Sequence, residues 1–125
     1  MSEHPITIEE IVSCLRSKGR ALGNSGVTLS EVRERRIHVS AVAADFDSSC
    51  AIGRISAWVS GEIDFQVLRR ESGEDVLFWH VTVSKLHTPD LERAYADFLR
   101  LMLNPGGAES NDTGEQLRAG SLGNT

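Results

Sequence analysis

The sequence predicts an α+β domain in which an antiparallel sheet of about five strands, a meander, is flanked by an N-terminal and a C-terminal helix. Two segments near the ends of the chain carry apolar residues at helical spacing. Between them, runs rich in β-branched and aromatic residues are separated by short turn signals, as in consecutive antiparallel strands. The length of 125 residues suits one domain with one hydrophobic core, which we place at residues 1–106.

The first helix is expected to begin after Thr7. The Thr7 hydroxyl and the Glu10 carboxylate have the spacing of a capping box, in which each accepts a hydrogen bond from the other residue's backbone N–H. An apolar stripe at positions i, i+3, i+4 and i+7 follows, consisting of Ile8, Ile11, Val12 and Leu15. Gly19 is a candidate helix end. The stripe is expected to cover one face of the sheet.

Alternating residues predict two strands before the centre of the chain, at 27–33 and 37–43. A charged turn at 33–36 is expected to join them, and residues 43–49 are expected to form a polar loop. Asp45 and Asp47 in this loop do not predict a calcium site, because the glycine and the closing glutamate of a calcium loop are missing.

Residues 50–83 are expected to form three further strands, with turns at 60–61 and 71–73. A two-residue turn would pair Val59 with Glu62, whereas a three-residue loop with Gly61 in the left-handed region pairs Trp58 with Glu62. We favour the three-residue loop because it gathers the apolar side chains on one face. These side chains are Ile55, Ala57, Ile63, Phe65, Val67, Leu77, Trp79 and Val81.

The opposite face of these strands is polar except for two aromatic side chains. Its residues are Arg54, Ser56, Trp58, Glu62, Asp64, Gln66, Phe78, His80 and Thr82. Exposed aromatic side chains among charges are typical of protein-binding hot spots. We therefore predict a partner-binding site formed by Arg54, Trp58, Glu62, Asp64, Phe78 and His80. The alternative is that loops or the 27–43 strands bury Trp58 and Phe78 in a second small core.

The second helix is expected to begin at Pro89, with Thr88 as its cap. Its apolar stripe consists of Leu91, Ala94, Tyr95, Phe98, Leu101 and Met102. Residues 104–107, Asn-Pro-Gly-Gly, end the helix. Residues 107–125 are small, polar and free of aromatic side chains, so we expect a disordered C-terminal tail.

The composition of the chain limits the kinds of molecule that the protein is expected to bind. A net charge of −5 disfavours a nucleic-acid binder and fits a basic protein partner. The chain has neither a membrane-length apolar run nor a secretory signal, which predicts a cytoplasmic protein without a membrane partner. Cys14 and Cys50 are therefore expected to be reduced thiols.

The sequence offers little for catalysis. It has no nucleotide-binding or nucleophile motif, and its histidines and cysteines lack ligand spacing, so no cofactor and no metal are expected. The register places His80 beside Asp64, a pair that could act as a general base. No nucleophile is obvious beyond Ser56 and Thr82, and we predict that the protein is not an enzyme.

Residues 53–67, GRISAWVSGEIDFQV, carry a family resemblance. The Gly-Arg-Ile run, Trp58, the Ser-Gly pair and the alternating strand after it resemble the core signature of the TriTu family of bacterial immunity proteins. The aromatic strand at 76–81 and the helix from Pro89 have the matching order. The resemblance implies a cytoplasmic antitoxin of a polymorphic toxin system, which binds a cognate toxin and blocks it by occlusion. A small acidic secretion chaperone and a small enzyme using His80 and Asp64 are the alternatives.

Overall fold

The computed structural model describes residues 6–36 and 38–106. The elements, in chain order, are α1 (Ile8–Ala21), β1 (Thr28–Arg35), β2 (Ala41–Asp47), β3 (Ala51–Trp58), β4 (Glu62–Arg69), β5 (Asp75–Thr82) and α2 (Pro89–Leu103). The strands form one antiparallel sheet in the order β1-β2-β3-β4-β5. The predicted α+β class is confirmed, whereas the predicted tail at 107–125 lies outside the described residues.

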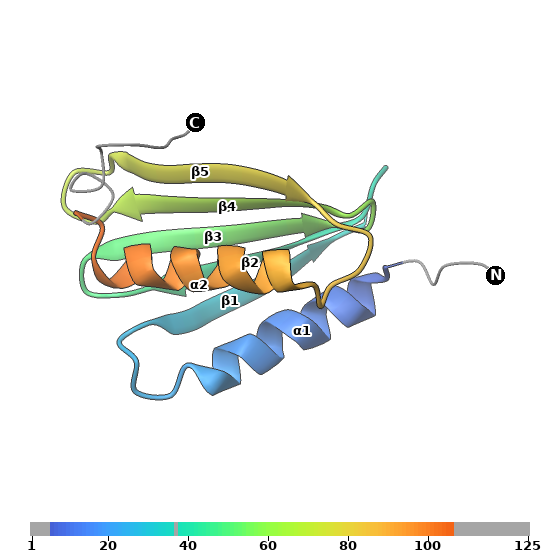
Figure 1. The fold of residues 1–125 in the computed structure, drawn as a ribbon, viewed down its shortest axis with the longest axis horizontal. Coiled ribbons are helices and arrows are strands. Elements are labelled where there is room, and N and C mark those ends of the chain that lie inside the picture. The colour runs from blue at the N-terminus through green and yellow to red at the C-terminus, as the bar shows by residue number, and fades with distance from the viewer. Residues whose placement is uncertain (1–5, 37, 107–125) are drawn as a thin grey trace.

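Both helices lie on the same face of the sheet (Figure 1). The α1 helix packs on β1 and β2, and α2 packs on β3, β4 and β5. Their buried side chains join those of the sheet in one hydrophobic core. The protein therefore has two layers, and the second face of the sheet has no helix over it. Neither described helix is long and apolar enough to span a membrane.

The predicted helix starts are confirmed. The Thr7 hydroxyl accepts a hydrogen bond from the Glu10 N–H at 3.1 Å, and the Glu10 carboxylate accepts one from the Thr7 N–H at 3.1 Å. In α2 the Thr88 hydroxyl accepts from the Leu91 N–H at 3.2 Å. These bonds satisfy N–H groups that have no partner inside the helix.

The predicted end of α1 at Gly19 is wrong, because the helix continues to Ala21. Gly19 has a packing role instead. A Cβ atom at this position would lie 2.5 Å from Cδ2 of Leu29 in β1, so glycine allows the helix to approach the sheet closely. Gly53 has the same role in β3, where a Cβ atom would lie 2.5 Å from Sδ of Met102 and 2.7 Å from Cζ of Phe98.

The predicted boundaries of the first two strands are wrong. The charged run predicted as a turn belongs largely to β1, which extends to Arg35, and β2 spans Ala41–Asp47 instead of 37–43. Most of the predicted 43–49 loop is therefore strand. Val42, Ala44 and Phe46 point into the core, and Val39 is 45% exposed. Phe46 explains this register, because it must face the core to pack edge-on against Phe98, with the two ring centroids 5.2 Å apart. Ile37 lies outside the described residues.

The predicted register of the central strands is confirmed. The pairs are Ala57 with Ile63, Ile55 with Phe65, Ile63 with Val81, Phe65 with Trp79 and Val67 with Leu77. Gly61 has a φ angle of +99° in the left-handed region, and its N–H donates to the Trp58 carbonyl at 2.9 Å. Trp79 departs from the expected core position, since it is 37% exposed at the sheet edge.

A candidate partner-binding face

The sheet face opposite the helices, here called the open face, carries the outward side chains of all five strands. Phe78 on β5 is 65% exposed on this face, and Trp58 on β3 is half-buried. The alternative in which Phe78 belongs to a second small core is therefore wrong. Exposed large aromatic side chains are costly in water, and they are typical of protein-binding surfaces.

The structure brings all six predicted site residues to the open face. Two-residue periodicity of the strands points alternate side chains outward. On β4, Glu62 faces Thr82, Asp64 faces His80 and Gln66 faces Phe78 across the β4–β5 pair. On β3, Arg54 faces Gln66 and Ser56 faces Asp64. The predicted residues Arg54, Trp58, Glu62, Asp64, Phe78 and His80 thus occupy three adjacent strands.

His80 and Asp64 form a direct polar contact. Nδ1 of His80 lies 2.5 Å from Oδ1 of Asp64, and both side chains reach solvent. Ser56 lies on the other side of Asp64, two strand spacings or about 10 Å from His80. This separation exceeds hydrogen-bond reach, so His80 does not activate Ser56 in this arrangement. The pair fixes the orientation of an acid and an imidazole on an open surface.

Asp45 lies on the open face in β2, although its sequence predicted a loop. Its carboxylate accepts from Arg54 at 2.7 Å and from Arg33 at 2.8 Å. Burial acts to raise the pKa of Asp45, but the hydrogen bonds and charges of Arg54 and Arg33 outweigh it and lower that pKa below its ordinary value. The alternation of Val42, Ala44 and Phe46 was the signal that could have placed Asp45 outward.

A shallow hollow lies beside this ion-pair cluster. Its lining includes Asp45, Asp47, Ile52, Arg54, Gln66, Leu68 and Arg70. Asp47 forms an ion pair with Arg70 across the hollow's end. Ile52 and Leu68 add apolar surface to the face, and neither was among the predicted site residues. A hollow with apolar side chains among paired charges can accept a protruding side chain of another protein.

Charge is unevenly distributed over the open face. The outward side chains of β1, β2 and β3 mix acids with Arg33, Arg35 and Arg54. The outward side chains of β4 and β5 include the acids Glu62, Asp64 and Asp75 but no lysine or arginine. The half of the face around Phe78 is therefore the more acidic half.

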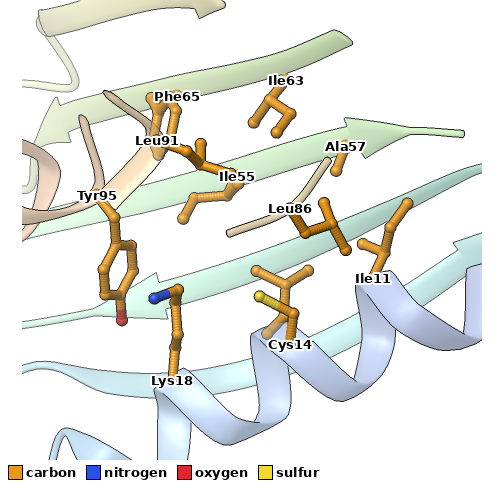
Figure 2. A pocket seen from close by; sticks show the side chains of 11 residues that line it. Ile11, Cys14, Lys18, Ile55, Ala57, Ile63, Phe65, Leu86, Leu91 and Tyr95 are labelled. Carbon is orange, nitrogen blue, oxygen red and sulfur yellow. The ribbon is translucent and has the colours of Figure 1, made fainter. Parts of the chain in front are cut away.

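The interior between the two helices and the sheet is closely packed. A gap of about 30 Å³ remains between α1, α2 and the sheet, with Lys18, Cys14 and Tyr95 at its margin (Figure 2). This volume holds about one water molecule. Lys18 lies 4.6 Å from the Tyr95 ring centroid and bonds Glu92 at 2.8 Å. Burial raises the pKa of Tyr95 to about 12 and also raises that of Cys14.

Metal-ligating side chains are dispersed over residues 6–36 and 38–106. Within these ranges, no group of three His, Cys, Asp or Glu side chains is placed to hold a metal ion. Cys14 and Cys50 are both free thiols. Cys50 lies near the end of α2, where its Sγ is 3.3 Å from the Leu103 carbonyl.

Comparison with known protein families identifies the family of this chain. The model of the immunity protein TriTu family matches residues 9–101, which run from α1 into the last turn of α2. The chain belongs to the TriTu immunity protein family. Among curated proteins, no sequence matches the chain significantly. Membership confirms the resemblance of residues 53–67, which span most of β3, the turn after it and most of β4.

As a TriTu immunity protein, the chain has a toxin as its partner. The matched range contains all five strands, so it includes every residue assigned to the open face. It also contains Gly53 and Gly61, whose missing side chains allow the close approach of α2 to β3 and of Val83 to the β3–β4 turn. The resemblance noted in the sequence thus lies on the two strands at the centre of the site.

Proposed function

We propose that this protein binds its cognate toxin through the open face and neutralises it by occlusion, without chemistry of its own. The observation that carries the proposal is the exposure of Phe78, at 65%, on a sheet face that no described element covers. The helices fill the other face and bury its apolar side chains. A partner that covers Phe78 would remove its apolar surface from water, which favours association.

The acidic half of the face favours a partner that carries basic groups. Glu62 and Asp64 lie on the strand next to Phe78, and Asp64 is already oriented by His80. Basic groups of a toxin would pair with these carboxylates around an aromatic anchor. Opposite charges on two partners also accelerate their encounter. The proposed site of action is the cytoplasm of the cell that produces the toxin.

The proposal is tested by co-expression with the cognate toxin, sought among the genes next to this protein's gene. We expect the Trp58→Ala/Asp64→Ala double variant to fold and to bind the toxin at least about 100-fold more weakly, because it removes an aromatic anchor and a charge. Growth of the co-expressing cells and pull-down of the toxin are the readouts. The control is the Asp90→Ala/Arg93→Ala variant, which removes an exposed ion pair on α2. A folded double variant that still protects cells fully would show that the face is wrong.

A further inference from the structure

The two edges of the sheet are β1 and β5, on opposite sides of the molecule (Figure 1). Within the described part of the chain, no strand pairs with the outer side of β5. An edge strand presents a row of backbone N–H and C=O groups that can pair with a strand of another chain. The side chains of an edge decide whether that pairing is blocked or favoured.

The backbone of β5 directs three residues toward its free edge. The Val83 N–H donates to the Gly61 carbonyl on the β4 side at 2.8 Å. Successive residues of a strand point their backbone groups to alternate sides, and the register from Leu77 to Thr82 is regular. Leu77, Trp79 and Val81 therefore bond β4. The N–H and C=O groups of Phe78, His80 and Thr82 point away from the sheet, with neighbours in this set about 7 Å apart.

The two edges differ in protection. The β1 edge carries Glu31, Arg33, Glu34 and Arg35, and its register shifts between Leu29 and Glu31. Charges and bulges of this kind block strand addition. Between residues 76 and 82, β5 has only His80 as an ionisable side chain. Its two large aromatic side chains, Phe78 and Trp79, point to opposite faces and are 65% and 37% exposed.

We propose that the toxin adds an extended segment to the free edge of β5, which extends the sheet by one strand. This inference rests on the proposed function, since it specifies how the toxin occupies the Phe78 side of the open face. Apolar side chains of the segment would cover Trp79 on the helix side of the sheet. Basic side chains on its other face would lie beside Asp75 on β5, and Glu62 and Asp64 on β4 would attract them at longer range.

Charge complementarity selects the toxin over a second copy of this chain. A second copy brings its own net charge of −5, with another Asp75 on its edge strand and another Asp64 one strand behind that edge. Like charges brought together in this way oppose association. A basic segment of the partner removes that repulsion, and it supplies donors for carboxylates that are exposed on β4 and β5.

The test is amide hydrogen exchange followed by NMR, on this protein alone and bound to an inactivated form of the toxin identified by co-expression. In the free protein we expect slow exchange at Leu77, Trp79 and Val81 and fast exchange at Phe78, His80 and Thr82. In the complex, exchange at the second set should slow by at least about tenfold, because each N–H gains a partner. A complex in which these three amides still exchange fast would overturn the inference while leaving the proposed function standing.

A proline variant tests the same edge by affinity. Thr82→Pro removes an outward N–H without removing a hydrogen bond to β4, so we expect the variant to fold. We expect it to weaken toxin binding about tenfold, and the side-chain control Thr82→Ala to stay within about twofold of wild type. Equal affinities of the two folded variants would contradict strand addition. If Thr82→Pro does not fold, the exchange pattern alone decides.

Two further outcomes separate the proposals. Absence of any complex with wild-type protein would overturn the proposed function, and this inference with it. Sedimentation of the free protein should show a monomer. A dimer with slow exchange at Phe78, His80 and Thr82 would assign the edge to a second copy and overturn the inference.

Discussion

At the scale of single residues, Asp45 shows how a position on the open face is fixed. Its carboxylate lies between the guanidinium groups of Arg33 and Arg54, one from each neighbouring strand. The ion pair with Asp45 holds Arg54 in place before any partner arrives, and Arg33 holds the Asp45 carboxylate from the neighbouring strand. A group fixed in advance loses less side-chain entropy on binding. Arg54 therefore contributes to the face as an oriented, partly neutralised charge.

The lowered pKa of Asp45 predicts a loss of stability in acid. A carboxyl group whose pKa is lower in the folded than in the unfolded protein stabilises the fold above the unfolded pKa. That contribution disappears as the pH falls from about 4 through the folded pKa. We expect the free energy of unfolding, measured with urea between pH 7 and pH 2.5, to fall less steeply in Asp45→Asn than in wild type.

The control for this experiment is Asp90→Asn, whose carboxyl group is exposed at the start of α2. It should retain the acid dependence contributed by Asp45. Identical pH profiles of wild type and Asp45→Asn would show that the two arginines do not stabilise the carboxylate.

At the scale of elements, the turn between β3 and β4 depends on glycine for two separate reasons. Gly61 has a φ angle of +99°, and a Cβ atom there would collide with the Val83 carbonyl oxygen. Gly73, in the turn between β4 and β5, has a φ angle of +73°, but a Cβ atom there would meet nothing within 4 Å. Comparing the two turns therefore separates the cost of the left-handed conformation from the cost of a steric clash.

Replacing these glycines with alanine should destabilise the protein unequally. Gly73→Ala should lower the free energy of unfolding by about 1 kcal/mol, because only the left-handed conformation is penalised. Gly61→Ala should lower it by about 2–4 kcal/mol, because the clash with Val83 is added. Urea unfolding at pH 7 measures both. Equal losses would mean that the β3–β4 turn relaxes to admit a side chain.

The elements also show where sequence reasoning succeeds. The central strands were predictable because Gly61 and the apolar pattern allow one register with a consistent inner face. The β1–β2 hairpin was not predictable from the sequence, because Asp45 and Asp47 give β2 the composition of a loop. Their partners, Arg33, Arg54 and Arg70, come from elsewhere in the chain. Local sequence cannot show that a tertiary ion pair makes an acid compatible with a strand.

The same limit applies to the site. The six predicted residues were placed by strand alternation alone, and the structure puts all six on one face. The hollow lined by Ile52 and Leu68 was missed, because their exposure depends on both helices covering the other face. Sequence periodicity could not decide which face α1 covers.

At the scale of the whole molecule, one face of the sheet forms the hydrophobic core with the helices, and the other face is left for binding a partner. Both helices bury the same side of the sheet, which leaves a broad second side for a partner (Figure 1). The net charge of −5 and the acids beside Phe78 give that partner an electrostatic direction of approach. Long-range attraction of this kind is screened by salt.

The proposed steering predicts a salt-dependent association rate. We expect the association rate constant with the toxin, measured by stopped-flow fluorescence, to fall at least about tenfold between 20 mM and 500 mM NaCl. The Glu62→Gln/Asp64→Asn variant should show a weaker dependence, because it lacks two of the acids on this half of the face. A rate that does not depend on salt would contradict the expectation of a basic partner.

The central claim is that the open face, and not the helix layer, binds the toxin. The chain offers a matched pair of exposed apolar residues for this comparison, Phe78 on β5 at 65% and Leu103 at the end of α2 at 48%. The most direct measurement is the toxin Kd of the Phe78→Asp and Leu103→Asp variants by calorimetry. We expect at least about 100-fold weaker binding for Phe78→Asp and little change for Leu103→Asp. A Kd that rises for Leu103→Asp and stays at the wild-type value for folded Phe78→Asp would contradict it.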